Sequence, residues 1–335
     1  MVLALVVAIF AGACGDGDNG DGDPGVEEGL SGSIVVSGSS TVEPISVGVA
    51  EKFSSINPDV EIRVDGPGTG DGFELFCNGE TDISDASRPI DTEEEVPACE
   101  DSGIEFIELK VAIDGLSVIT SPANDAVECL SFPDLYALLG PESEGFSRWS
   151  DANALGKEVG GSGDYPDASL DVTAPGEESG TYDSFVEITL EDIAEAQGQD
   201  ATTRPDYQAS ADDNVIIEGI ANNDTSLGWV GFAFAVQNPD AIRALPIEAE
   251  EGGGCVEPNP ETIASGEYPI ARDLFIYVNK AKMEEKPEVA AYVDYYLSDE
   301  GIASATEVGY VDLASEDLEA TRSVWESKET GTREG

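Results

Sequence analysis

The chain has 335 residues, enough for two α/β domains or one large one, and 40% of them are hydrophobic. Its 70 acidic residues against 15 Lys and Arg give a formal net charge of -55, which argues against partners such as nucleic acid or an anionic membrane surface. There is no histidine, which excludes Ser-His-Asp and Cys-His catalysis and the commonest zinc ligand. Because the apolar residues fall into periodic runs, we interpret the charge as a solvated acidic surface, as expected for a salt-rich or acidic habitat.

The first residues have the pattern of an export signal. Met1 to Ala13 is apolar and then small, and is too short to span a bilayer as a helix. We expect residues 1–14 to be a secretory signal cut before Cys14, which is then lipidated. A signal peptide without lipidation is the alternative, because no Lys or Arg precedes the apolar run and Ala11 stands where leucine is usual. Residues 15–32 are rich in Gly and Asp and predict a flexible linker.

The first folded elements predict a parallel sheet. A strand at 33–37 leads into Ser39, Ser40 and Thr41, and Thr41 is expected to cap a helix whose first turn holds Glu43 and Pro44. That helix carries apolar residues at every fourth position, and an alternating strand follows at 60–64. Such a strand-loop-helix-strand order places its loops at the carboxyl ends of the strands.

Residues 64–90 hold a glycine-rich loop between two strands. Glycines at 66, 68, 70 and 72 allow unusual backbone conformations, and the loop runs into a short helix. The unpaired N–H groups and the positive end of that helix can face an anion. Ser84, Asp85, Ser87 and Arg88 follow the next apolar step, so the stretch can hold a small oxyanion. The alternative is a surface turn with ordinary capping.

A third loop of this kind occurs in the second part of the chain. It runs from a strand at 170–173 into a helix, with Ser179, Gly180 and Thr181 at the helix start, where a simple helix cap is the alternative. The other elements that we predict are strands at 104–109 and 111–120, a helix at 133–139, a loop at 151–166, a helix at 215–221, strands at 227–230 and within 268–278, and a helix at 287–297. The tail after Leu318 is polar, and we expect it to fray.

Four cysteines remain after Cys14. No C-x-x-C pair is present, so a zinc or iron–sulfur site is not expected. An even number in an exported chain suggests two disulfides, with three pairings open. We favour Cys77–Cys99, which closes a local loop, and Cys129–Cys255, which stays within one predicted domain.

Taken together, these loops resemble the phosphate-binding proteins of bacterial ABC phosphate importers. Four blocks carry the resemblance: S-G-S-S-T-V-E-P from Ser37, G-T-G-D-G-F from Gly68, D-I-S-D-A-S-R-P-I from Asp82, and S-G-T-Y-D-S-F from Ser179. Each is weak alone, but their order and spacing are specific, and the similarity covers about Gly32 to Tyr310. The resemblance implies a two-lobed periplasmic-binding-protein type II fold, in which each lobe is a mixed, mainly parallel sheet flanked by helices and two crossings form the hinge.

The resemblance also implies the ligand residues of a dehydrated cleft. The positions that match the family's binding loops are Ser39, Ser40, Thr41, Val42, Thr69, Gly70, Asp85, Arg88, Ser179, Gly180 and Thr181. Many members have an arginine six residues before the threonine of the last loop, where this chain has Pro175. Arg88 is the expected substitute, since a subgroup of the family has S-R-P at that place.

Asp85 matches the acceptor aspartate of the family. Phosphate near neutral pH keeps a proton that it can donate to a carboxylate, whereas sulfate has none. In a dehydrated cleft the sulfate oxygen and the carboxylate would be two acceptors without a hydrogen between them. We therefore expect Asp85 to select phosphate over sulfate, unless it only caps the next turn or pairs with Arg88.

These observations predict an exported solute-binding protein that captures inorganic phosphate and delivers it to the permease of an ABC transporter. We expect no cofactor, no metal and no enzyme activity, a monomer, a membrane attachment through the lipid alone, and lobes formed by 33–118 with 272–320 and by 119–271, followed by a polar tail at 321–335. Another tetrahedral oxyanion, sulfate or arsenate, is the alternative ligand. A phosphoester hydrolase using Ser40 or Thr181 is the alternative from another class, but it would need an activating base or a metal.

Overall fold

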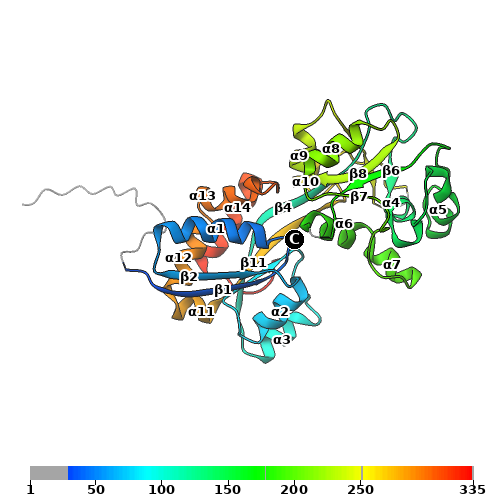
Figure 1. Ribbon diagram of the computed structural model, residues 1–335. Coiled ribbons are helices and arrows are strands. Elements are labelled where there is room, and N and C mark those ends of the chain that lie inside the picture. The colour runs from blue at the N-terminus through cyan, green and yellow to red at the C-terminus, as the bar shows by residue number, and fades with distance from the viewer. Residues whose placement is uncertain (1–28, 178, 250–251, 334–335) are drawn as a thin grey trace, which may run out of the picture.

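The structure is a computed structural model, and it describes residues 29–333 apart from 178 and 250–251. Two groups of elements lie side by side, and the long strands β4 (Phe106–Thr120) and β11 (Ala271–Asn279) run between them (Figure 1). The predicted signal, lipidation site and most of the linker lie outside the described residues. Within the described part, no helix is long and apolar enough to cross a membrane.

One mixed sheet extends through both groups in the order β2-β1-β3-β11-β4-β8-β6-β7, and β9 also pairs with β4. The strand β1 pairs in parallel with β2 and β3, and β6 pairs in parallel with β7 and β8, whereas β11 and β4 are antiparallel to their neighbours. The other strands are β1 (Gly32–Gly38), β2 (Val60–Asp65), β3 (Ile83–Ala86), β6 (Asp171–Ala174), β7 (Gln208–Ala209), β8 (Ser226–Gly231) and β9 (Arg243–Ala244), with β5 (Leu130–Ser131) and β10 (Ile247–Glu248) as a separate pair. The α/β prediction is confirmed.

Helices cover both parts of the sheet. In the group that contains the first residues, here called the N-terminal half, they are α1 (Glu43–Ile56), α2 (Thr69–Cys77), α3 (Glu95–Asp101), α11 (Lys280–Glu285), α12 (Pro287–Tyr296), α13 (Asp299–Glu307) and α14 (Ser315–Ser327). In the other group, the central half, they are α4 (Phe132–Leu139), α5 (Asn153–Val159), α6 (Gly180–Thr189), α7 (Glu191–Gln197), α8 (Asp213–Ala221), α9 (Phe232–Gln237) and α10 (Pro260–Ala264), with 3-10 turns at Pro141–Ser143 and Trp149–Ala152.

Each half has its own hydrophobic core. The main N-terminal core gathers α1, α12 and the inner strands around Phe53 and Tyr292, whose rings meet edge to face. The core of the central half gathers α4, α6 and β8, and Phe185 stacks on Trp229 there. Burial of apolar surface is the main term that stabilises a fold. Each half therefore has a core of its own that fixes the strands and helices from which its loops start.

Both predicted disulfides are present. Cys77 and Cys99 join α2 to α3, and Cys129 and Cys255 join two segments of the central half. The pairing favoured from loop length and domain membership is therefore confirmed.

Three sequence predictions are wrong. The tail does not fray, because α14 continues to Ser327 and buries Trp325, whose indole N–H donates to Asp294. The predicted loop at 151–166 contains the helix α5. Thr41 does not cap α1, which begins at Glu43 after Val42 and has no side-chain cap.

Candidate anion-binding site

The loops that follow β1, β2 and β6 carry the starts of α1, α2 and α6 toward the junction of the two halves (Figure 1). A cavity of about 550 Å³ lies there, lined by Gly68, Thr69, Gly70, Asp71, Ser87 and Arg88 from the N-terminal half, by Glu187 and Glu191 from the central half, and by Arg272 and Asp273 of the crossing strand β11. The predicted binding loops and this cavity therefore lie in one region.

The start of α2 offers the best placed backbone donors. Gly68 has a φ of 120°, a backbone conformation that favours glycine, and it turns the chain into the helix. The N–H groups of Thr69, Gly70 and Asp71 make no hydrogen bond among the described residues, as expected for a first helical turn. The Thr69 hydroxyl lies 3.0 Å from that of Ser87, so two hydroxyls stand beside these donors.

Arg88 lines the same cavity but does not pair with Asp85. Its guanidinium binds both carboxylate oxygens of Glu95, at 2.7 and 2.8 Å, and lies over the ring of Phe73. These contacts lie on the side of α2 and α3. Arg88 thus lies at the wall of the cavity, with a partner that the sequence did not indicate.

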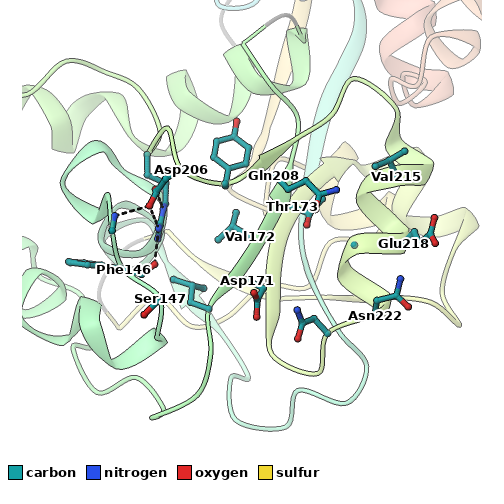
Figure 2. A pocket seen from close by; sticks show the side chains of 16 residues that line it. Phe146, Ser147, Asp171, Val172, Thr173, Asp206, Gln208, Val215, Glu218 and Asn222 are labelled. Carbon is teal, nitrogen blue, oxygen red and sulfur yellow. Dashed lines mark hydrogen bonds and ion pairs between the residues drawn. The ribbon is translucent and has the colours of Figure 1, made fainter.

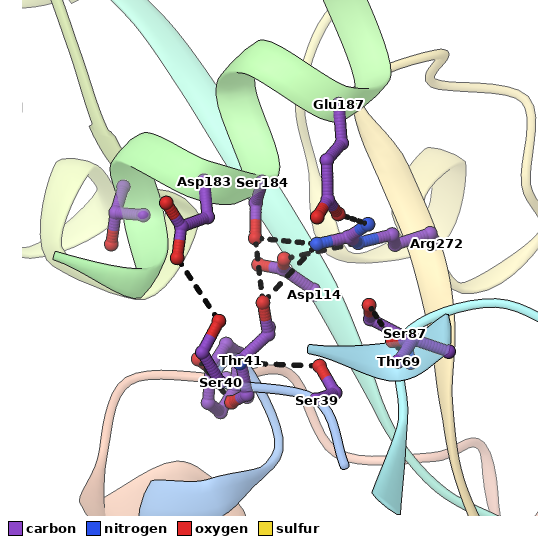
Figure 3. Close-up of polar contacts among 12 residues, drawn as sticks. Ser39, Ser40, Thr41, Thr69, Ser87, Asp114, Asp183, Ser184, Glu187 and Arg272 are labelled. Carbon is purple, nitrogen blue, oxygen red and sulfur yellow. Dashed lines mark hydrogen bonds and ion pairs between the residues drawn. The ribbon is translucent and has the colours of Figure 1, made fainter. Parts of the chain in front are cut away.

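The first loop is mostly engaged in its own hydrogen bonds. The Ser39 hydroxyl accepts from the N–H of Thr41, and the Ser39 carbonyl accepts from the N–H groups of Val42 and Glu43. The hydroxyls of Ser40 and Thr41 instead point across to the other half (Figure 3). Val42 is completely buried, so its side chain serves packing.

The start of α6 is a true helix cap. The Ser179 hydroxyl accepts from the N–H of Thr181, and the Ser179 carbonyl accepts from Tyr182 and Asp183. Gly180 lies against the first loop, since a Cβ there would be 3.7 Å from the Ser40 carbonyl oxygen. Thr181 lines a second cavity of about 300 Å³ together with Asp114 and Tyr310.

Asp85 lies beneath the first loop and not in either cavity. Its carboxylate is fully buried, accepts from the Ser46 hydroxyl at 2.9 Å, and lies near Tyr292 and Tyr296. Burial raises the pKa of Asp85 to about 7. Its backbone carbonyl accepts from the N–H of Ser39, so it supports the loop. This position does not support the predicted contact between its carboxylate and an anion in the cleft.

Arg272, at the start of β11, is the first of three residues at this place, with Ser184 and Asp114, that the sequence did not indicate. One guanidinium nitrogen donates to the hydroxyls of Ser184, at 2.8 Å, and Thr41, at 3.2 Å, and the other pairs with Glu187 (Figure 3). Thr41 belongs to the N-terminal half and Ser184 to the central half. A cation that lines the cavity therefore joins hydroxyls from both halves.

A second buried carboxylate faces this cation. Asp114, in the middle of β4, is 2% exposed, and its Oδ2 lies 3.6 Å from Nε of Arg272. No described residue donates a hydrogen bond to that oxygen. Burial raises the pKa of Asp114, although the charge of Arg272 and the hydroxyl of Ser184 oppose the rise.

Several contacts cross between the halves at this point. Ser40 donates to Asp183 at 3.0 Å, and the hydroxyls of Thr41 and Ser184 are 3.3 Å apart. Arg272 lines the larger of these two cavities and Asp114 the smaller, and together with Thr41 and Ser184 they form one connected group, which we call the bridge. The bridge brings together a cation, a carboxylate acceptor and two hydroxyls.

A sequence signal for Arg272 and Asp114 exists, although it is weak. Both residues are charged and stand inside apolar strands at the two crossings, where charges are seldom buried without a partner. The sequence alone could therefore have suggested an ion pair between the basic residue of one crossing, Arg272, and Asp114, which interrupts the apolar strand of the other.

A larger cavity, of about 690 Å³, lies elsewhere in the central half, between β6, β7 and α8 (Figure 2). It contains none of the predicted binding residues. Arg204 is the one cation among its lining residues, and this guanidinium is buried and paired with Asp206 and the Phe146 carbonyl. Asp171 and Glu218 also line this cavity, and their negative charges disfavour the binding of an anion there.

The described residues contain no group of three or more His, Cys, Asp or Glu placed to hold a metal ion. The donors of the bridge and of the α2 start are hydroxyls, amides and guanidinium groups, which suit an anion. The chemistry of the region therefore favours holding an oxyanion.

Comparison with known proteins agrees with this geometry. The family model described as "PBP superfamily domain" matches residues 25–300. Protein SphX of Synechocystis is 36% identical over 302 residues, covering 90% of this chain and 84% of that protein. The phosphate-binding protein PstS of Staphylococcus epidermidis is 34% identical, covering 92% and 86%. The crystal structure of a possible phosphate binding protein from Planctomyces limnophilus is 36% identical, with a TM-score of 0.79, and covers 89% and 99%.

Proposed function

Since this chain belongs to the PBP superfamily and, within it, to the phosphate-binding proteins of ABC phosphate transporters, we propose that it captures inorganic phosphate between its two halves for delivery to a permease. The observation that carries the proposal is the convergence of the α2 start, Arg88 and Arg272 on one cavity, with Arg272 bonded to the hydroxyls of Thr41 and Ser184. An oxyanion there meets donors from both halves.

The phosphate is held at the bridge. Its oxygens accept from the Arg272 guanidinium and from the hydroxyls of Thr41 and Ser184, which already lie within 3.3 Å of one another or of the guanidinium. The N–H groups at the start of α2 and the Thr69 hydroxyl reach it from the N-terminal half. Gly180 and Thr181, at the start of α6, reach it from the central half.

Asp114, rather than Asp85, is the acceptor for the phosphate proton. Its carboxylate is part of the bridge and, like that of Asp85, keeps one oxygen without a hydrogen-bond donor among the described residues, but Asp114 alone of the two faces Arg272. A protonated phosphate can supply that donor, whereas sulfate cannot. Asp85 contributes by supporting the first loop from below through its carbonyl.

We assign residues 33–118 and 272–320 to one lobe and residues 119–271 to the other. Two separate cores, joined by β4 and β11, support this division. Such crossings allow the lobes to close on a ligand by small changes at a few residues. The contacts of Ser40 with Asp183 and of Thr41 with Ser184 then form on closure.

The protein acts outside the cytoplasm. The two disulfides suit an oxidising compartment. We keep the proposal that residues 1–14 direct export and that Cys14 carries a lipid anchor, with residues 15–32 as the linker. The partner is the permease of the importer, and a single chain is sufficient for the site.

Calorimetry tests the proposal. The dialysed protein is titrated with phosphate, arsenate and sulfate, and we expect one phosphate per chain, arsenate as a competitor, and much weaker sulfate. Arg272→Ala should bind more weakly by at least about 100-fold, because a buried charge-assisted donor is removed. Arg148→Ala is the matched control, since Arg148 is an exposed arginine paired with Asp167 outside both cavities. No heat with phosphate, or equal losses in both variants, would overturn the assignment.

A further inference from the structure

We propose that Glu95 is a positioning residue that fixes Arg88 so that one edge of its guanidinium is presented to the phosphate. This inference rests on the proposed function and adds a residue outside all the binding loops. Glu95 begins α3, seven residues after Arg88, and it is not among the residues that line the cavity.

The hydrogen bonds of Arg88 show which edge remains. Nη1 donates to Oε2 of Glu95 and to the Pro89 carbonyl, and Nη2 donates to Oε1 of Glu95. A guanidinium has five N–H groups. The two left over, on Nε and on Nη2, make no hydrogen bond among the described residues, and they form a fork that matches two oxygens of a phosphate.

The free edge lies beside the start of α2. Nη2 of Arg88 would be 4.0 Å from a Cβ placed on Gly70, whose N–H is one of the unpaired helix donors. The fork and the helix N-terminus therefore serve the same anion. Phe73 supports the guanidinium from one face at 5.5 Å, which limits its rotation.

Glu95 is itself held in place. Its Oε2 accepts from the N–H of Asp91 at 2.7 Å, and its side chain is 18% exposed. The sulfur of Cys77 lies 3.6 Å from the Glu95 carbonyl oxygen, and the Cys77–Cys99 disulfide ties the end of α2 to α3. The α2–α3 unit thus carries the helix donors at one end and the partner of Arg88 at the other.

An arginine in this chain needs a fixed partner. Asp71, Glu187 and Glu191 also line the cavity, and a free guanidinium could turn toward any of them. A bidentate carboxylate outside the cavity prevents this, since binding groups held by a supporting shell lose less freedom when the ligand arrives. Pairing with Glu95 therefore offsets part of the positive charge of Arg88 but fixes the orientation of its guanidinium.

The test is phosphate calorimetry on the full chain with Glu95→Gln. We expect the dissociation constant to rise roughly tenfold, the low end of what removal of an orienting partner costs in metal sites. Glu100→Gln is the matched control: it makes the same charge change on the exposed side of the same helix, and we expect no change. Thermal melting of each variant checks that the fold is kept.

A double-mutant cycle separates positioning from a general loss of structure. In an Arg88→Ala background, Glu95→Gln should have no further effect on phosphate affinity, because its target is gone. If Glu95→Gln binds like the parent, or weakens binding as much in the Arg88→Ala background, the inference is overturned. Failure of the parent chain to bind phosphate is a different result, since it contradicts the proposed function itself.

Discussion

Two aspartates of the sheet differ in their surroundings although their burial is the same. Asp85 in β3 and Asp114 in β4 are both almost completely shielded from solvent, and burial raises the pKa of both. Asp85 has neighbours from the N-terminal half alone, the hydroxyl of Ser46 and two tyrosines. Asp114 faces Arg272, a cation that also contacts hydroxyls from both halves.

This difference shows that a raised pKa does not by itself identify the carboxylate that contacts a ligand. Desolvation acts on any buried acid, whatever lies beside it. A carboxylate can accept a proton from a ligand only where the ligand's other oxygens also find donors. Around Asp114 these donors are present in the bridge, whereas Asp85 accepts from the Ser46 hydroxyl of α1, which itself contacts the Tyr296 hydroxyl.

The largest expected effect concerns the choice between phosphate and sulfate. We expect Asp114→Asn to remove most of the preference for phosphate, because the amide can donate to a sulfate oxygen. A site built to accept a ligand hydrogen can reject the analogue lacking it by roughly 10⁴-fold, so the change in the affinity ratio can be of that order. Competition calorimetry with both anions measures it.

Asp85→Asn is the control for this prediction, since it makes the same substitution at the other buried aspartate. We expect its affinity ratio to remain within a few-fold of the parent. A collapse of the preference in Asp85→Asn, with Asp114→Asn unchanged, would return the acceptor role to the residue that the sequence indicated.

The second prediction concerns stability at Asp85. Its folded pKa, about 7, lies above its ordinary value of 3.8, so between these values the unfolded chain ionises while the folded chain stays protonated. Asp85 therefore destabilises the fold as pH rises from 4 to 7, and by a constant amount above that. Relative to the parent, Asp85→Asn should gain about 4 kcal/mol of stability between pH 4 and pH 8, since each unit by which the folded pKa is raised costs about 1.36 kcal/mol.

Urea denaturation of both chains at several pH values measures this gain. Because only the difference between parent and variant is used, the other titrating groups largely cancel. Parallel stability curves for the two chains would show that Asp85 is ionised in the folded protein throughout this range.

Much of the fold and part of the site could be predicted from the sequence. The glycine-rich loop, the starts of α1, α2 and α6, and both disulfides follow from local patterns, because turns and helix starts depend on nearby residues. The helix α14 could not be predicted from its polar composition, since its stability depends on Trp325 packing against a distant core.

The bridge could not be predicted from the sequence for a physical reason. Arg272 and Asp114 are 158 positions apart in the sequence and meet because β11 and β4 pair, with Arg272 opposite Asp114 in the register. No local pattern encodes such a pairing. Asp85, in contrast, lies within a recognisable motif, but the direction of its side chain depends on which face of β3 packs against α1.

The third prediction tests the cation of the bridge. Arg272→Lys keeps the charge but cannot hold Thr41, Ser184 and Glu187 together, because a lysine lacks the planar fork. We expect phosphate binding to weaken about 100-fold, within the range for losing one partner of a buried charged contact. Arg148→Lys, measured by the same calorimetry, is the control and should bind as the parent does.

The smallest expected effect is at Thr181, which shares a cavity with Asp114 and not with Asp85. Its hydroxyl makes no hydrogen bond among the described residues, so in our proposal it is free to donate to the phosphate. Thr181→Ala removes one donor to an anion, which costs about 1.5–3 kcal/mol, or 10-fold and upward in affinity. Thr181→Ser keeps the hydroxyl and should restore most of the binding, whereas Thr181→Val keeps the shape and should not.

The matched change Thr189→Ala removes a hydroxyl that donates within α6 to the Phe185 carbonyl, away from both cavities, and should leave affinity unchanged. If Thr181→Ala binds phosphate as tightly as the parent, the start of α6 only caps its helix. In that case Asp114 contacts the phosphate without a hydroxyl from Thr181 beside it.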